Sequence, residues 1–367
     1  MSRTLIISCN KSPTEMSTDT GKIITVKGAI DPAQLGITLT HEHLLVHFEA
    51  ALQPTRYLDR DVTDVQLKLE NQGVIRQYPY SVKSNLTITS PDLVCSELQL
   101  YKIAGGSTIV DCSPTSLRYR PDLLVDISQR SDVNIICGCG YYVDAFMSEE
   151  TKMMTKEEMA AAIIQEVQEG IKGTTFRSGV IGEIGCSSPL TDTETRSLQA
   201  AAIAQRVTGA PLIIHPGRSP ESPFQILKVL EAAGADISHT VMSHLDRTIF
   251  DKEQLLQFAK RGTYLEYDLF GMECSHYQFA DVDMPSDAQR IQMIKFLIDQ
   301  GYQQRVMMAH DIHTKHRLVH YGGHGYGHIL RNIVPKMVDR GIEREAVMNI
   351  LTQNSKEWLT FITPTTN

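Results

Sequence analysis

Residues 36–43 read GITLTHEH, a short run with β-branched residues that leads directly into two histidines. A run of this kind is typical of a buried strand. In α/β barrels the residues just past the C-terminal ends of the strands carry the chemistry. The stretch therefore predicts a strand over residues 36–40, and it marks the place where a functional site would be built.

Seven further short apolar runs follow along the chain, and longer helical patterns lie between most of them. With residues 36–40 they make eight expected strands, the others being 107–111, 133–138, 179–182, 211–214, 239–242, 263–266 and 305–308. The expected helices are 91–104, 157–171, 193–207, 223–233, 251–260, 286–299, 329–339, 343–351 and 356–361. This alternation predicts an α/β fold, most simply a (β/α)8 TIM barrel. A doubly wound open sheet is the alternative.

Outside the strands and helices, three segments stand out. Residues 1–22 are expected to be a flexible polar tail, and residues 23–367 a single barrel domain. Long connections follow the first and eighth strands, at 44–90 and 309–327, and would form rim loops beside the site. The second contains glycines at 322, 323, 325 and 327, which disfavour a helix and favour a mobile lid over the pocket.

The composition excludes several classes of partner. A formal net charge of -8 argues against a nucleic acid or an anionic membrane surface. The chain has no apolar run of the ~18–20 residues needed to cross a bilayer, and its first apolar run is too short for a secretory signal. Seven cysteines without a framework spacing are typical of reduced thiols in a cytoplasmic protein.

Six ionisable side chains stand at the ends of the predicted strands and are candidate metal ligands: His41, His43, Glu183, His215, His244 and Asp311. Because side chains alternate across a strand, His41 and His43 share one side and Glu42 faces the barrel wall. Taken singly, each candidate has a structural alternative, such as a helix cap for Glu183 or a core position for His215. Their joint occurrence after strands one, four, five, six and eight favours a shared site.

Imidazoles and carboxylates without thiolates suit Zn²⁺. Two divalent metal ions ~3.5–4 Å apart need a shared ligand, and Glu183 is the candidate because a carboxylate has two oxygens. One ion would take His41, His43 and Asp311, and the other His215 and His244. A bridging hydroxide would then attack a carbonyl carbon, and Asp311 would be the catalytic residue that carries its proton to the leaving group.

The motifs that surround these ligands resemble those of the phosphotriesterase family of the amidohydrolase superfamily, most closely its animal phosphotriesterase-related branch. They are LTHEHL at 39–44, IGEIGC at 181–186, IHPGR at 214–218, MSHLDR at 242–247, LEYDLFG at 265–271 and AHDIHTK at 309–315. The resemblance covers residues 22–362. It implies a metal-dependent barrel with the six ligands above, a homodimer, and hydrolysis of N-acetyltaurine and related N-acyl amino acids. The bacterial members usually bridge their metals with a carbamylated lysine, where this chain has Glu183.

A small anionic N-acyl substrate would need cationic groups near the metals. Arg247 and Lys315 are the nearest by sequence, and Tyr142 and Tyr267, at the ends of strands three and seven, are expected to line the pocket. For Arg247 the alternative is a structural ion pair. Two other functions stay open: a lactonase or phosphotriester hydrolase that uses the same site, and a binding protein without catalysis. The sequence contains no G-x-S-x-G nucleophile elbow, so nothing in it supports an acyl-enzyme route.

Overall fold

The computed structural model describes residues 19–55 and 58–365, and eight parallel strands form its centre. In spatial order the strands are β3 (Thr38–Glu42), β6 (Thr108–Asp111), β7 (Asn134–Cys139), β8 (Val180–Gly185), β9 (Leu212–His215), β10 (Thr240–Met242), β11 (Tyr264–Tyr267) and β12 (Val306–Met308). A hydrogen bond from the Asp311 backbone N–H to the His41 carbonyl (3.1 Å) brings the end of the eighth strand against the first. The predicted TIM barrel is confirmed, and each predicted strand matches an observed one within a few residues.

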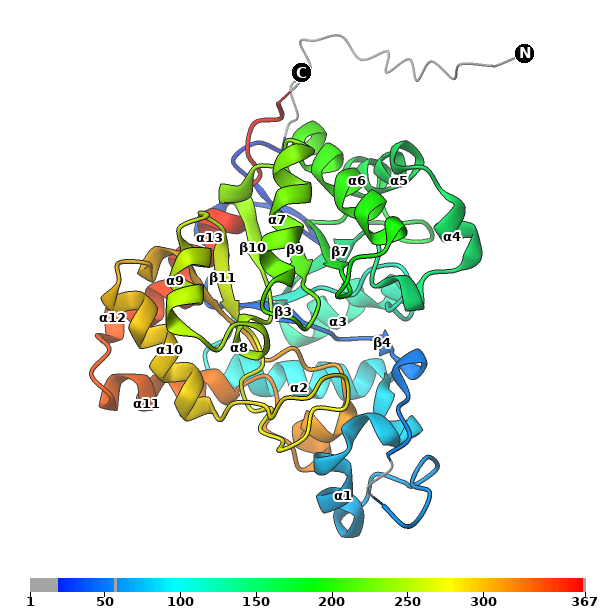
Figure 1. Cartoon of the computed structure of the whole chain (residues 1–367), viewed down its shortest axis with the longest axis vertical. Helices are drawn as coiled ribbons and strands as arrows, with labels where there is room; N and C mark the ends of the chain where they lie inside the picture. Colours follow the sequence, from blue (N-terminus) through cyan, green and yellow to red (C-terminus); the bar gives the residue numbers. More distant parts are fainter. Residues whose placement is uncertain (1–18, 56–57, 366–367) are drawn as a thin grey trace.

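Helices cover the outside of the strands (Figure 1). They are α2 (Pro91–Ile103), α3 (Leu124–Ser131), α4 (Glu149–Met153), α5 (Lys156–Gln168), α6 (Asp192–Thr208), α7 (Ser222–Ala232), α8 (Leu245–Thr248), α9 (Lys252–Ala259) and α10 (Asp287–Asp299). The C-terminal part adds α11 (Val334–Asp339), α12 (Arg344–Asn349) and α13 (Ser355–Leu359), with π-helical turns at Ile329–Ile333 and Ile350–Asn354. The sequence prediction missed the short helices α3, α4 and α8.

The barrel interior is a closed apolar core at the end where the strands begin. Seven strands each contribute one buried side chain to it: Val110, Ile136, Val180, Ile213, Val241, Tyr264 and Met307. Trp358 of α13 packs into the same core and donates a hydrogen bond from its indole N–H to the Leu212 carbonyl (3.3 Å). Since α13 occupies this end, the opposite end, where the strands terminate, is left for the site.

The two long connections are structured rim segments. The first holds a small antiparallel pair, β4 (Val46–His47) with β5 (Thr87–Ile88), and helix α1 (Gln72–Gln77) at the lower end of the molecule in Figure 1. The second is anchored to the barrel by Arg317, whose Nη1 donates to the Asp311 carbonyl (2.6 Å), and by Tyr326, whose hydroxyl donates to the His43 carbonyl (2.8 Å).

Among the described residues, the first strands are those of the hairpin β1 (Ile23–Thr25) and β2 (Gly28–Ile30). Most of the predicted tail, residues 1–18, lies outside the described residues. Asp19, which the prediction places in that tail, instead pairs with Arg177 through two contacts of 2.7 and 2.9 Å. Within the described ranges, no helix combines the length and the apolar character that crossing a membrane requires.

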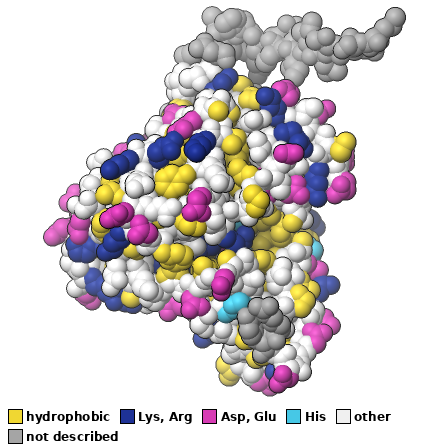
Figure 2. All heavy atoms as spheres, viewed as in Figure 1, with side chains coloured by type: hydrophobic (Ala, Val, Ile, Leu, Met, Phe, Trp, Pro, Cys, Tyr) yellow, Lys and Arg dark blue, Asp and Glu magenta, His cyan; other side chains and the backbone are white. Residues whose placement is uncertain are grey.

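The surface in Figure 2 mixes acidic and basic side chains rather than gathering one sign of charge. Lys and Arg lie among Asp and Glu over the visible face, and hydrophobic side chains border the hollow in its middle. This face therefore has no extended basic surface of the kind that binds a nucleic-acid backbone.

The interior core predicts that an isoleucine-to-alanine substitution changes the stability very differently at two positions. Ile136→Ala removes a fully buried side chain in β7 and is expected to lower the free energy of unfolding by about 2–5 kcal/mol. Ile103→Ala removes a side chain that is 82% exposed at the end of α2, and is expected to change it by less than about 0.5 kcal/mol. Denaturant unfolding measures both. Equal effects would contradict the assignment of Ile136 to the core.

Candidate metal centre

The six predicted ligands converge at the C-terminal end of the barrel, around the carboxylate of Glu183. One Glu183 oxygen, Oε2, lies 2.8 Å from His215 Nδ1, 3.4 Å from His41 Nε2 and 3.5 Å from His244 Nε2. The other, Oε1, lies 3.4 Å from His43 Nε2. A single carboxylate is therefore in contact with four imidazoles, two from the strands β3 and β9 and two from the residues just after β3 and β10.

Asp311 completes the cluster from the segment that follows β12. Its Oδ1 lies 3.1 Å from His43 Nε2 and 3.8 Å from His41 Nε2. Asp311 and His244 both have left-handed backbone conformations, with φ of 53° and 54°. Such conformations cost energy in residues other than glycine and gather at functional sites. Here they turn both side chains inward where the strands end.

A second group of side chains fixes the orientation of the imidazoles. Asp268 accepts from His244 Nδ1 (2.7 Å) and also lies 3.1 Å from His41 Nδ1. The His43 Nδ1–H faces Ser113 Oγ at 2.8 Å. With their Nδ1 atoms engaged, His41, His43 and His244 each present Nε2 to the cluster, the arrangement expected of metal-ligating histidines.

Glu42 points away from the cluster, as the strand alternation predicts. Its carboxylate accepts hydrogen bonds from the backbone N–H groups of His310 and Ile312, both at 2.9 Å. Burial raises the pKa of Glu42 to about 8. Its contact with both neighbours of Asp311 holds that segment in place beside β3.

The cluster has the chemical character of a cation site. The buried His41 Nε2 has no hydrogen-bond partner among the described residues. Burial opposes protonation of His43, yet the carboxylates of Asp311 and Glu183 raise its pKa to about 9. Burial likewise disfavours the ionised form of Glu183, but His215 and His41 hold the pKa of that carboxyl well below its usual range. The site thus attracts positive charge, which protons or metal ions can supply.

Donor atoms lie close enough to share an ion in two groups within the cluster. His41, His43 and Asp311 form one, and His41, Glu183 and His244 the other; in each, the atoms lie within 4.8 Å of one another. Both consist of imidazole nitrogen and carboxylate oxygen, which are ligands for zinc. The residues present therefore fit the divalent metal that the sequence predicts.

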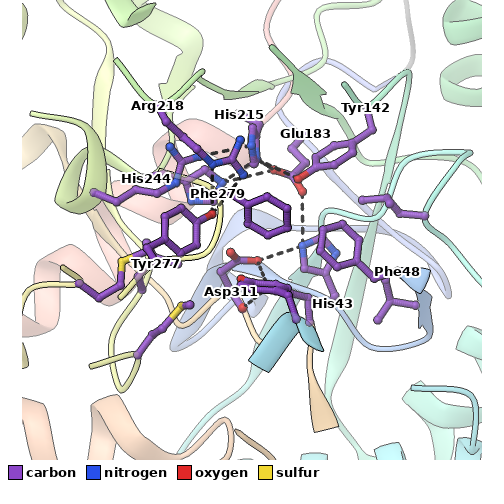
Figure 3. A pocket seen from close by; sticks show the side chains of 18 residues that line it. His43, Phe48, Tyr142, Glu183, His215, Arg218, His244, Tyr277, Phe279 and Asp311 are labelled. Atoms are coloured by element: carbon purple, nitrogen blue, oxygen red, sulfur yellow. Dashed lines mark hydrogen bonds and ion pairs between the residues drawn. The ribbon is translucent and has the colours of Figure 1, made fainter. Parts of the chain in front are cut away.

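The cluster forms the floor of a cavity with aromatic walls (Figure 3). Phe48, Tyr80 and Tyr142 line it from the first half of the chain. The loop between β11 and α10 supplies a further part of the wall, with Leu269, Met272, Tyr277, Phe279 and Met284. The predicted lid is wrong in position, because residues 316–328 contribute no lining residue and instead border a separate surface cavity.

Of the four residues predicted to bind substrate, two line the cavity and two do not. Tyr142 and Arg247 line the cavity, and the Tyr142 hydroxyl lies 3.4 Å from His215 Nδ1. Tyr267 lies elsewhere: its neighbour Glu266 faces inward to accept a hydrogen bond from Thr40, so alternation turns Tyr267 outward. Lys315 is half-buried and does not line the cavity. Of the four, Tyr267 and Lys315 are therefore not brought to the cavity.

Arg247 is buried but does not form the ion pair that was its structural alternative. Its Nη2 donates to the Pro216 carbonyl at 3.1 Å and lies 3.2 Å from His215 Nε2. The neighbouring Asp246 pairs instead with Arg290 at 2.8 Å. The guanidinium thus keeps its charge available beside the cluster.

Sequence reasoning missed Arg218 and His313. Arg218 Nε and Nη2 donate to the Tyr277 hydroxyl at 3.2 and 3.1 Å. His313 lies with its Nδ1 3.1 Å from Asp311 Oδ1, and its Nε2 faces the Tyr80 hydroxyl at 2.9 Å. A signal for Arg218 existed, because it follows His215 by three residues, the same spacing that separates Arg247 from His244.

Comparisons with known proteins agree with this geometry. The model of the phosphotriesterase family matches residues 21–359. Proteins named N-acetyltaurine hydrolase are 50% identical in Xenopus tropicalis and 47% identical in Homo sapiens, each over 94% of this chain and all of the relative. A resiniferatoxin-binding protein from Rhodobacter sphaeroides has a similar crystal structure, with a TM-score of 0.91 and 32% identity over 95% of this chain and 98% of that one. The chain belongs to the phosphotriesterase family.

Proposed function

We propose that this chain is a metal-dependent amidohydrolase that cleaves N-acetyltaurine and related N-acyl amino acids, giving taurine and acetate in the first case. The observation that carries the proposal is the contact of one buried carboxylate, Glu183, with four imidazoles on the floor of a pocket. The relatives named N-acetyltaurine hydrolase, which match 94% of the chain, support the choice of substrate. The homodimer and the cytoplasmic location stay predictions of the sequence.

The proposed cofactor is a pair of divalent cations, best suited to Zn²⁺. His41, His43 and Asp311 would hold one cation and His215 and His244 the other, with Glu183 contributing to both. Such ions act as Lewis acids toward a carbonyl oxygen and lower the pKa of water to about 7. Glu183 can serve both positions because its two oxygens face different imidazoles.

The proton carrier of the proposed reaction is Asp311. The oxygen of water forms the new bond to the acyl carbon, and Asp311 takes the proton that this oxygen releases. The carboxyl then gives the proton to the amide nitrogen as its bond to carbon breaks, so that the amine departs neutral. His313, 3.1 Å from the same carboxylate, orients Asp311, and Tyr80 in turn orients His313.

The aromatic wall would receive the acyl group. Phe48 and Tyr142 stand on the side of the cavity near Glu183 and His43 (Figure 3). Burial raises the pKa of the Tyr142 hydroxyl well above its usual value, so it stays a neutral hydrogen-bond donor. A small acyl chain would pack against these rings with its oxygen within reach of that hydroxyl.

Loss of one imidazole from the cluster should abolish turnover. Zinc-loaded wild-type protein is expected to release acetate and taurine from N-acetyltaurine, and His41→Ala is expected to lower kcat/KM by at least 10³-fold, on the order of a lost essential catalytic group. His47→Ala is the matched control, because its imidazole is half exposed outside the cluster, and activity should stay within about twofold.

The same assay includes a lactone and a phosphotriester as competing substrates. Faster turnover of either than of N-acetyltaurine would contradict the proposed substrate, and a fully active His41→Ala protein would contradict the proposed ligand set.

Asp268 should tune metal affinity although it is not a proposed ligand. Asp268→Ala removes the carboxylate partner of His244 Nδ1 and one of the contacts of His41 Nδ1, and is expected to weaken zinc binding about 10–100-fold, as measured by chelator competition. Asp126→Ala, which removes an exposed carboxylate on α3, serves as the control and should leave zinc affinity unchanged. Equal affinities for the Asp268→Ala and wild-type proteins would show that this carboxylate does not support the site.

A further inference from the structure

Two guanidinium groups, Arg218 and Arg247, line the cavity without a carboxylate partner. Among residues 19–55 and 58–365, no Asp or Glu lies within ion-pair distance of either. Among the other arginine side chains that are largely buried, Arg290 contacts Asp246 at 2.8 Å and Arg118 contacts Glu166 at 2.7 Å, whereas Arg317 donates to three backbone carbonyls outside the cavity lining. Buried charges are normally compensated, so two uncompensated cations in one cavity indicate a place for a negatively charged ligand.

The two arginines differ in how many N–H groups they have free to donate to a ligand. Arg247 is held deep in the cavity wall by the Pro216 carbonyl and the Thr248 hydroxyl. Arg218 is only partly buried, and its Nε and Nη2 donate to the hydroxyl of Tyr277. Its Nη1 makes no hydrogen bond to a described residue. Arg218 is therefore the guanidinium that can reach a ligand, while Arg247 adds positive charge behind it.

Aromatic contacts hold Arg218 in place before any ligand arrives. The guanidinium lies 4.9 Å from the centroid of Phe279 and 5.5 Å from that of Tyr277, both in the loop between β11 and α10. Figure 3 shows Arg218 and Tyr277 on one side of the cavity. A guanidinium fixed on aromatic faces loses little entropy when it binds an anion.

The same wall leads from Arg218 to the proposed proton carrier. Tyr277 and Tyr80 are edge-to-face with centroids 6.1 Å apart, and Tyr80 reaches Asp311 through His313. On the other side, Arg247 lies 3.2 Å from His215 Nε2. The positive charge and the cluster thus face one cavity, as a single short substrate with an acyl group at one end and an anion at the other would require.

We propose that Arg218 binds the anionic end of the substrate, with Arg247 as the second positive charge, and that this pair selects N-acyl amines that end in a sulfonate. The inference rests on the proposed amide hydrolysis and specifies its substrate class. A sulfonate stays ionised at every physiological pH and offers three oxygens to the free donors of a planar guanidinium. An N-acyl amine without the anion would leave both arginines uncompensated.

The test compares N-acetyltaurine with N-acetylethanolamine, in which a hydroxyl replaces the sulfonate. Arg218→Met is expected to lower kcat/KM for N-acetyltaurine by roughly 10–100-fold, the range for a lost hydrogen bond to a charged group. For N-acetylethanolamine the same variant should change kcat/KM by less than about threefold. Arg261→Met, which removes a surface arginine paired with Glu231, is the control and should affect neither substrate.

A binding measurement gives an answer that does not depend on turnover. Calorimetric titration of zinc-loaded protein with taurine should show binding by the wild type and by Arg261→Met, and a loss of at least tenfold in affinity for Arg218→Met. N-acetyl-β-alanine, with a carboxylate in place of the sulfonate, should be hydrolysed more slowly than N-acetyltaurine by the wild type.

The outcomes separate this inference from the proposed function. Hydrolysis of N-acetyltaurine that Arg218→Met leaves unchanged, or an equal loss for charged and uncharged substrates, would overturn the role of Arg218 while the amidohydrolase stands. Wild-type protein that binds taurine through Arg218 but hydrolyses no N-acyl amine would instead overturn the proposed reaction and keep the anion subsite.

Discussion

The carboxylate of Glu183, buried among four imidazoles, is the constraint on which the site depends. Burying an ionised carboxylate is costly unless positive charge surrounds it, and here the surrounding side chains are bases that prefer a cation to share. The barrel solves the geometric part of this problem. Its parallel strands end at one rim, so residues far apart in sequence reach a common point without long side chains or special loops.

Outer contacts make the arrangement rigid. Asp268 holds one imidazole from each of the two proposed metal positions, and Glu42 binds the backbone on both sides of Asp311. Glu42 lies in the HEH motif itself, so the same three residues supply two ligand candidates and the anchor of a third. Because these three residues have several roles, the short stretch at 36–43 predicts both the fold and the site.

The sequence predicted the barrel and the convergence of six side chains because both follow from local patterns repeated at each strand. Helices α3, α4 and α8 were missed because they have only eight, five and four residues, too few to repeat the helical spacing of apolar residues clearly. Tyr267 and Lys315 were placed by distance along the chain, which does not say which way a side chain points at a strand end. The cavity wall from Tyr277 and Phe279 was missed because it comes from an irregular loop whose path depends on tertiary packing.

These contacts give the strands and the loops different roles. The strands fix the reactive groups, while the loop between β11 and α10 shapes the space above them and positions Arg218 through aromatic contacts. Relatives that share the cluster can therefore differ in substrate through this loop without disturbing the chemistry beneath it.

The most direct measurement of the central claim is anomalous X-ray diffraction from crystals of the zinc-loaded protein, collected on both sides of the zinc absorption edge. The account predicts two anomalous peaks, one on each side of the Glu183 carboxylate, with His41, His43 and Asp311 around one and His215 and His244 around the other. Zinc peaks absent from this end of the barrel, or located away from Glu183, would contradict it.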